Sequence, residues 1–197
     1  MKYLNFPNLL TFIRLIISPL TLPILLVYLL PYNMGWLNLI LAALFVLFSL
    51  TDVFDGYLAR AWNQETKLGK LLGPIADKFL SASVLIALVA AHKIFFYWAV
   101  ILIGRALFSM GLCILSLEHS IPVPVTFWGK INTVVQVTYI AVAIFNPYQH
   151  LHFSSKLTIL EWGLLSTAIL LSIISVKKYL HGFITQFMMR QKPEQEV

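Results

Sequence analysis

Long apolar stretches, broken at intervals by charge, proline or glycine, dominate the pattern of this chain. The first is extreme, since no Asp, Glu, Lys or Arg occurs between Leu15 and Thr51, a run of 37 residues. A membrane-spanning helix needs about 20 apolar residues, so this run has room for parts of two spans. Pro31 to Trp36 predict the turn between them. The whole pattern predicts six helical spans, at residues 9–30, 36–59, 73–91, 95–117, 127–146 and 158–180.

The composition narrows the class of protein. Hydrophobic residues make up 59% of the 197 residues and charged residues only 11%, against about 25% charged residues in an average soluble domain. So few charged groups cannot cover the surface of a soluble globule. Cys113 is the one cysteine, which excludes an internal disulfide. The class predicted is an all-α integral membrane protein, because in lipid a helix satisfies its own backbone hydrogen bonds.

The positive charges predict the orientation. With six spans both termini lie on one side, and the other side holds only Lys93 and Lys156. The first side holds Lys2, Arg14, Arg60, Lys67, Lys70, Lys78, Arg105, Lys130, Lys177, Lys178, Arg190 and Lys192. Cytoplasmic loops are rich in Lys and Arg, so both termini are expected in the cytoplasm. The net charge of +6 favours anionic lipid, and the dispersed basic residues do not indicate nucleic acid.

The first span does not resemble a cleaved signal peptide, because it contains three prolines and Arg14 and lacks a small-residue cleavage site. No linker divides the chain. Residues 1–187 are therefore predicted to form a single membrane domain, and residues 188–197 a polar tail.

All three aspartates fall within 26 consecutive residues, at the predicted cytoplasmic ends of spans two and three. Asp52 and Asp55 are three apart, so on a helix they face the same way. Gly69, Gly73 and Asp77 are spaced by four and share another helix face. If the two faces meet, three carboxylates converge. Oxygen ligands without His or Cys suit a hard cation such as Mg²⁺ or Mn²⁺.

Basic residues surround these carboxylates and suit a substrate that carries phosphate. They are Arg60, Lys67, Lys70 and Lys78. Each feature also has an ordinary structural explanation. Asp52 and Asp55 could be helix-end carboxylates that pair with Lys or Arg, and Asp77 could pair with Lys78 or Arg105 for folding alone. The small residues could serve helix packing. The combination of all these features favours a metal and phosphate site.

The same residues form a spaced string, Asp52-x2-Asp55-Gly56-x2-Ala59-Arg60-x8-Gly69-x3-Gly73-x3-Asp77. It resembles the signature of the CDP-alcohol phosphatidyltransferase family, D-x2-D-G-x2-A-R followed after eight or nine residues by G-x3-D-x3-D. The resemblance covers roughly residues 5–140. Residues 7–14 are similar to the opening of bacterial phosphatidylglycerophosphate synthases within this family, and residues 129–136 to their G-K-x-K-T-x2-Q segment.

Three positions depart from that pattern. Gly73 replaces an aspartate of the signature, and Ala106 replaces the acidic residue that often follows the fourth-helix arginine. Asn132 replaces the second lysine of G-K-x-K-T and is similar to the S-K-x-N-T of CDP-alcohol-type cardiolipin synthases. If the signature aspartate at this position binds metal in the family, the resemblance implies that this chain, with Gly73, binds one ion weakly or not at all.

The resemblance implies a mechanism and roles. CDP-diacylglycerol is the donor, CMP the leaving group, and two ions, Mg²⁺ or Mn²⁺, are held by Asp52, Asp55 and Asp77. Asp77 also takes the proton of the acceptor hydroxyl. The residues that would line the nucleotide are Thr51, Gly56, Ala59, Arg60 and Gly69. Arg105 and Lys130 would hold an acceptor phosphate, for which a planar guanidinium is well suited.

Glycerol 3-phosphate is the acceptor that this assignment favours, and two alternatives stay open. Asn132 favours a cardiolipin synthase, which uses phosphatidylglycerol as acceptor. Gly73 and Ala106 favour a catalytically silent member that only binds the nucleotide lipid. A transporter is disfavoured, because the charges lie towards one membrane face and mark no path across. The resemblance also implies a homodimer in the bacterial inner membrane, in contact with membrane lipids, with its active site facing the cytoplasm.

Overall fold

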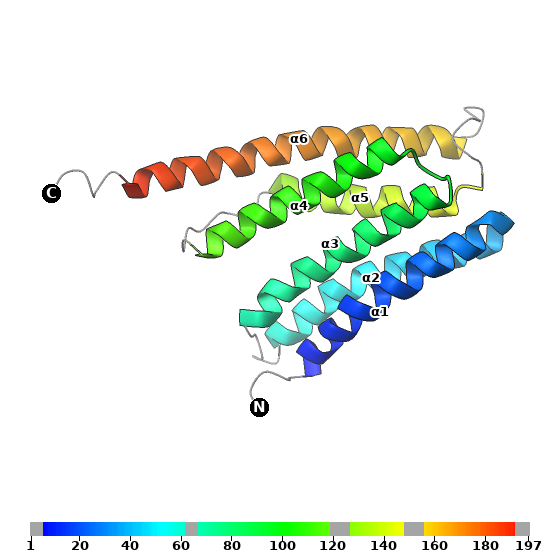
Figure 1. Ribbon diagram of the computed structural model, residues 1–197, viewed down its shortest axis with the longest axis horizontal. Helices are drawn as coiled ribbons and strands as arrows, with labels where there is room; N and C mark the ends of the chain where they lie inside the picture. Colours follow the sequence, from blue (N-terminus) through cyan, green and yellow to red (C-terminus); the bar gives the residue numbers. More distant parts are fainter. Residues whose placement is uncertain (1–5, 62–66, 119–126, 148–155, 192–197) are drawn as a thin grey trace.

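The computed structural model describes residues 6–61, 67–118, 127–147 and 156–191, and these are almost entirely helical (Figure 1). The helices are α1 (Phe6–Leu29), α2 (Gly35–Ala61), α3 (Lys67–Ala90), α4 (Phe96–Glu118), α5 (Phe127–Phe145) and α6 (Lys156–Gln191), with a short 3-10 helix η1 (Leu30–Tyr32) after α1. The described residues contain no strand. The prediction of an all-α fold with six long helices is therefore confirmed.

Two helices extend beyond their predicted spans by more than three residues. α3 begins at Lys67, six residues before the predicted start at 73, and α6 ends at Gln191, eleven residues after the predicted end at 180. A span prediction counts apolar residues only, whereas a helix continues through lysine and glutamine, which are good helix formers. At 36 residues, α6 is about 54 Å long, and Figure 1 shows it projecting past the other helices towards the C-terminus.

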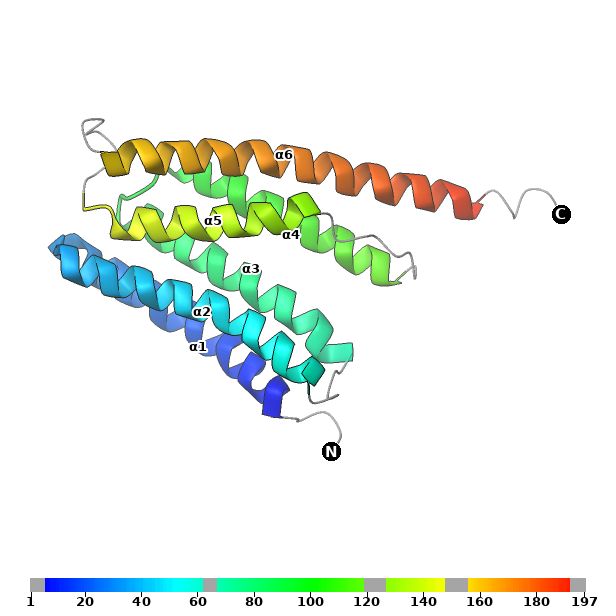
Figure 2. The same cartoon turned by 180° about the vertical axis from the view of Figure 1, so that it is seen from behind.

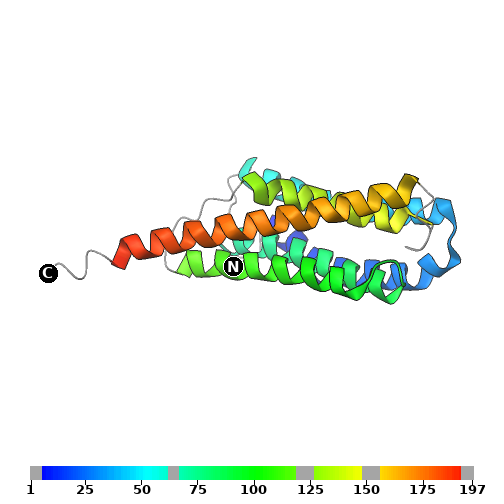
Figure 3. The same cartoon turned by 90° about the horizontal axis from the view of Figure 1, so that it is seen from above.

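The six helices form two layers of three (Figure 3). In one layer α3 packs between α1 and α4, and in the other α5 packs between α2 and α6. Contacts of α1 with α2 and of α4 with α6 join the layers at both sides. Seen from behind, α1 and α2 run side by side and α5 lies along α6 (Figure 2). As a result α2 and α3, which carry the aspartates, lie in opposite layers and contact each other.

Two left-handed residues end helical segments. Asn33, with φ 52°, caps η1 and donates its backbone N–H to the carbonyl oxygen of Leu30 at 3.0 Å. Asparagine tolerates this conformation, and the turn predicted at Pro31–Trp36 is confirmed. At the end of α3, His92 has φ 55° and Lys93 donates its backbone N–H to Leu88 at 2.8 Å, which is a Schellman motif.

Large apolar side chains cover the outside of the bundle as well as its interior. Tyr28 is 72% exposed, Trp36 63% and Phe96 67%, and exposed Ile, Leu, Val and Phe side chains run along α1, α4 and α6. Soluble monomers rarely expose contiguous apolar patches larger than a few hundred Å². The outer surface is consistent with a membrane protein.

By length and composition, one helical stretch in the described part of the chain suffices to cross a membrane. It is Lys156–Gly182, within α6. Within α1 with η1, α2, α4 and α5, the apolar stretches whose side chains are described are shorter, at Ile16–Tyr32, Gly35–Thr51, Phe96–Leu112 and Gly129–Phe145. Six spans with both termini in the cytoplasm therefore stay a prediction.

Candidate active site

The signature residues lie on two helices that contact each other. Asp52, Asp55, Gly56, Ala59 and Arg60 belong to the last turns of α2, and Gly69, Gly73 and Asp77 to the first turns of α3. Both helices are uninterrupted here, so the spacings of three and four keep each set within one helical arc. Of these side chains, only that of Asp77 belongs to the part of the chain that the structure describes in detail.

Asp77 is half-buried about three turns into α3. The Lys78 ammonium donates a hydrogen bond to its Oδ2 at 2.8 Å. The pair with Lys78, one of the two structural alternatives considered for Asp77, is thus present. Ion pairs at partly exposed positions contribute only about 0.2–1 kcal/mol, so this contact is a weak competitor for a divalent cation or a substrate hydroxyl.

Thr51 lies at the edge of the signature and is half-buried. Its hydroxyl donates to the backbone carbonyl oxygen of Leu47, one turn earlier, at 2.6 Å. This bond uses the hydroxyl proton, while the oxygen retains acceptor capacity. Thr51 can therefore accept a hydrogen bond from a ligand amino group more easily than it can donate one to a phosphate.

Arg105 is only 8% exposed, on α4, and meets Asn132 of α5, which is completely buried. With the amide oxygen turned towards Arg105, that oxygen lies 2.8 Å from Nη1, 2.8 Å from Nη2 and 3.1 Å from Nε. The amide nitrogen then donates to the backbone oxygen of Ala168 on α6 at 2.9 Å. The reverse orientation would place an NH₂ group against a cation, so electrostatics assigns this one.

Sequence reasoning named Arg105 and Asn132 separately but missed that they touch. It also missed Ser172 of α6, whose hydroxyl lies 3.3 Å from the same amide oxygen. The only signal in the sequence was the departure from lysine at position 132. A buried guanidinium inside a helix bundle needs polar neighbours, which explains why three helices contribute to this cluster.

Lys130 lies on a different face of α5. It is exposed, as are Val134 and Thr138 at spacings of four, whereas Asn132 and Gln136 share the buried face. Residues two apart on a helix point in different directions. Lys130 therefore points away from the face of α5 that contacts Arg105.

The donor set fits a hard divalent cation in kind, because the predicted ligands are carboxylates alone. Among the side chains that the structure describes, no group of three His, Cys, Asp or Glu residues could hold a metal ion. Asp52 and Asp55 fall outside that part of the chain. The aspartates of α2 and α3 thus have the appropriate chemistry for such an ion. That all three carboxylates lie close together stays a prediction.

A second polar cluster, which the sequence did not predict, lies at the other end of α3. Lys93 is buried in the loop after this helix, at 6% exposure, and donates to the Asn146 carbonyl oxygen at 2.8 Å. The Asn146 amide donates to Glu161 Oε2 at 2.8 Å. Desolvation lowers the pKa of Lys93, while the Glu161 carboxylate opposes that shift. Lys93 was expected in this outer loop, but its burial was not foreseen.

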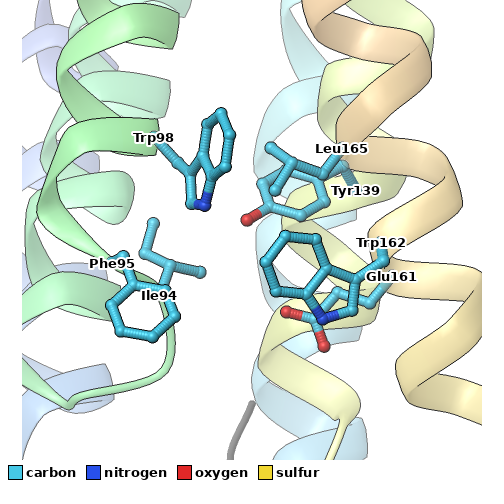
Figure 4. A pocket seen from close by; sticks show the side chains of 7 residues that line it. All are labelled: Ile94, Phe95, Trp98, Tyr139, Glu161, Trp162 and Leu165. Carbon is cyan, nitrogen blue, oxygen red and sulfur yellow. The ribbon is translucent and has the colours of Figure 1, made fainter. Parts of the chain in front are cut away.

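A pocket adjoins this cluster (Figure 4). It is lined by Ile94, Phe95, Trp98, Tyr139, Glu161, Trp162 and Leu165. Trp98 and Trp162 meet edge to face across it, with ring centroids 6.3 Å apart and planes at 87°. Asp77 and the end of α3 at Ala90 are about 20 Å apart along the helix axis. The pocket is therefore distinct from the signature residues.

Comparison with known proteins connects the signature to a family. The family model described as CDP-alcohol phosphatidyltransferase matches residues 4–174. The CDP-diacylglycerol–glycerol-3-phosphate 3-phosphatidyltransferase of Salmonella choleraesuis is 33% identical over 150 residues, which cover 73% of this chain and 78% of that protein. Proteins of the same name from Sodalis glossinidius and Escherichia coli K12 are each 34% identical, again over 73% of this chain and over 79% and 78% of their own lengths. The chain therefore belongs to the CDP-alcohol phosphatidyltransferase family.

Proposed function

We propose that the protein transfers the phosphatidyl group of CDP-diacylglycerol to glycerol 3-phosphate, releasing CMP and giving phosphatidylglycerophosphate. The observation that carries the proposal is the match over most of the chain to relatives named for this reaction. The buried guanidinium of Arg105, in contact with the neutral Asn132, agrees with an acceptor that brings a phosphate. In the reaction, a bond forms between the acceptor oxygen and the β-phosphorus as the bond to the CMP oxygen breaks.

Asp52, Asp55 and Asp77 are the proposed ligands of Mg²⁺ or Mn²⁺. When bound, such ions neutralise the charge that develops on the pyrophosphate and the leaving group. Asp77 is also the proposed general base that takes the proton from the attacking hydroxyl.

The residues that would contact the nucleotide come from both aspartate-bearing helices. They are Thr51, Gly56, Ala59, Arg60 and Gly69. Small residues allow cytidine and phosphate groups close to the backbone. Arg60 would supply positive charge to the phosphates.

Arg105 is the proposed anchor of the acceptor phosphate, because its planar guanidinium can give two parallel hydrogen bonds. Burial strengthens such bonds through the lower local dielectric. Lys130 is exposed on another face of α5, so we assign it a contribution to attracting the anionic acceptor at the membrane surface. The two residues thus have unequal roles.

The proposed setting is a bacterial inner membrane. Residues 1–187 would form one membrane domain with six spans, both termini and the signature residues on the cytoplasmic side, and the 188–197 tail beyond it. The asymmetry of Lys and Arg supports this orientation, and the apolar outer surface supports contact with membrane lipids. A homodimer is part of the same proposal.

Two alternatives have a specific observation behind them. Asn132 at the second lysine position of the acceptor segment favours a cardiolipin synthase with phosphatidylglycerol as acceptor. Gly73, which lacks a signature carboxylate, favours a member that binds the nucleotide lipid without turnover.

Release of CMP by the purified protein in detergent tests all three. CDP-diacylglycerol and Mg²⁺ or Mn²⁺ are supplied, with glycerol 3-phosphate or phosphatidylglycerol in separate reactions. Metal-dependent release with glycerol 3-phosphate alone is the expected result. Release only with phosphatidylglycerol would establish the cardiolipin synthase, and nucleotide-lipid binding without release would establish the silent member.

A further inference from the structure

The contact between Arg105 and Asn132 has an informative geometry. One amide oxygen lies at nearly equal distances, 2.8, 2.8 and 3.1 Å, from all three guanidinium nitrogens. These nitrogens surround a single carbon, so a point almost equidistant from them lies above that carbon, over the face of the planar group. The N–H bonds of a guanidinium point outwards in its plane. The amide oxygen therefore attracts the cation without using its in-plane hydrogen-bonding directions.

Helix α6 in turn fixes the Asn132 amide. Its nitrogen donates to the Ala168 carbonyl oxygen at 2.9 Å, and the Ser172 hydroxyl lies 3.3 Å from its oxygen. Asn132 and Ser172 are both buried. An amide held at both ends has one orientation, so a chain of contacts runs from α6 through α5 to the guanidinium on α4.

The residue type at position 132 matters because the amide is neutral. A carboxylate at this place would cancel the charge of Arg105. Asparagine holds the cation and leaves its net charge for an anionic ligand. We infer that Asn132 is a positioning residue that presents the Arg105 guanidinium to the phosphate of the acceptor, and that Ser172 of α6 supports it.

This inference rests on the proposed function, and its first test is steady-state kinetics of Asn132→Asp. The substituted side chain has nearly the same shape but carries a negative charge. We expect the KM for glycerol 3-phosphate to rise by about tenfold or more, with kcat and the KM for CDP-diacylglycerol within about twofold of the unaltered protein. A purely structural role would lower active protein and leave the acceptor KM unchanged.

A second pair of variants keeps the test informative if Asn132→Asp does not fold. Ser172→Ala removes one contact to the Asn132 oxygen and should raise the acceptor KM about two- to fivefold, since a single neutral hydrogen bond makes only a modest net contribution. Ser166→Ala is the matched control. Ser166 is exposed on the same helix, with its hydroxyl bonded to the Trp162 carbonyl oxygen at 2.8 Å, so its removal should leave the acceptor KM unchanged.

Direct binding separates failure of the inference from failure of the proposed function. Calorimetric titration of glycerol 3-phosphate into the metal-loaded protein needs no turnover. If the unaltered protein neither turns over nor binds glycerol 3-phosphate, the proposed function fails and the inference with it. If it binds or turns over and the folded Asn132→Asp and Ser172→Ala variants match it in acceptor KM or affinity, the inference alone is overturned.

Discussion

The ammonium group of Lys93 lies 2.8 Å from the backbone carbonyl oxygen of Asn146, although 53 positions separate the two residues. The Asn146 amide continues the connection to Glu161, also at 2.8 Å. The loop after α3, the end of α5 and the first turns of α6 are thereby joined. These bonds hold together helix ends that lie far from the aspartates along the bundle.

Lys93→Met should lower the stability of the fold. The substitution removes the buried hydrogen bond from Lys93 to the Asn146 carbonyl oxygen, and a hydrogen bond made by a charged group contributes about 1.5–3 kcal/mol. Thermal unfolding in detergent should show a fall of several degrees in the unfolding temperature. Lys156→Met is the control, because Lys156 is exposed near the same end of the bundle. Equal unfolding temperatures for the two variants would contradict the structural role of Lys93.

The lowered pKa of Lys93 predicts a pH dependence. In the unfolded chain the ammonium titrates near its ordinary value of 10.5, and in the folded protein it loses the proton at lower pH. Between these two values the unfolded state binds more protons, so the stability of the folded state rises with pH. The neutral amine still donates to the Asn146 carbonyl oxygen. The difference between the unfolding temperature of the unaltered protein and that of Lys93→Met should therefore increase, in favour of the unaltered protein, as the pH rises towards 10.5. A difference that shrinks over this range would contradict the prediction.

Gly73→Asp should strengthen metal binding. It adds a carboxylate in the signature stretch of α3, one turn before Asp77. We expect the metal concentration for half-maximal CMP release to fall by about tenfold or more, which is about 1.4 kcal/mol of binding free energy. Gly73→Asn is the matched control, because it adds nearly the same volume without the charge. A gain from both variants would show that the space is filled rather than that a ligand is restored.

Asp77→Asn should abolish most activity while changing stability little. Loss of a general base typically costs about 10²–10⁴-fold in rate, whereas the pair with Lys78 contributes at most about 1 kcal/mol. Lys78→Met tests the two parts separately and should retain most of the activity. If Lys78→Met lost as much activity as Asp77→Asn, Lys78 would itself belong to the catalytic machinery.

The sequence predicted the helices well, because long apolar runs between Pro, Gly and charge allow little else. The string from Asp52 to Asp77 likewise predicted the family. The sequence did not predict the tertiary contacts. Nothing in the spacing of Arg105 and Asn132 indicates that α4 and α5 lie together, and α6 matches no part of the signature. The burial of Lys93 accompanies the left-handed conformation of His92, which turns the backbone after α3 towards the interior of the bundle. A propensity for that conformation in a histidine is too weak to predict.

Arg105→Lys is the sharpest test of the acceptor site. Lysine keeps the positive charge but loses both the planar fork and the stacked contact with Asn132. Since hydrogen bonds to charged groups contribute about 1.5–3 kcal/mol, the KM for glycerol 3-phosphate should rise about 10- to 150-fold. Lys130→Met, at an exposed position on the other face of α5, should raise it only a few-fold and less at high salt, where surface charges are screened. The measurement is CMP release against glycerol 3-phosphate concentration at two ionic strengths. A larger effect of Lys130→Met than of Arg105→Lys would place the acceptor phosphate on the exposed face of α5 and remove Arg105 from the site.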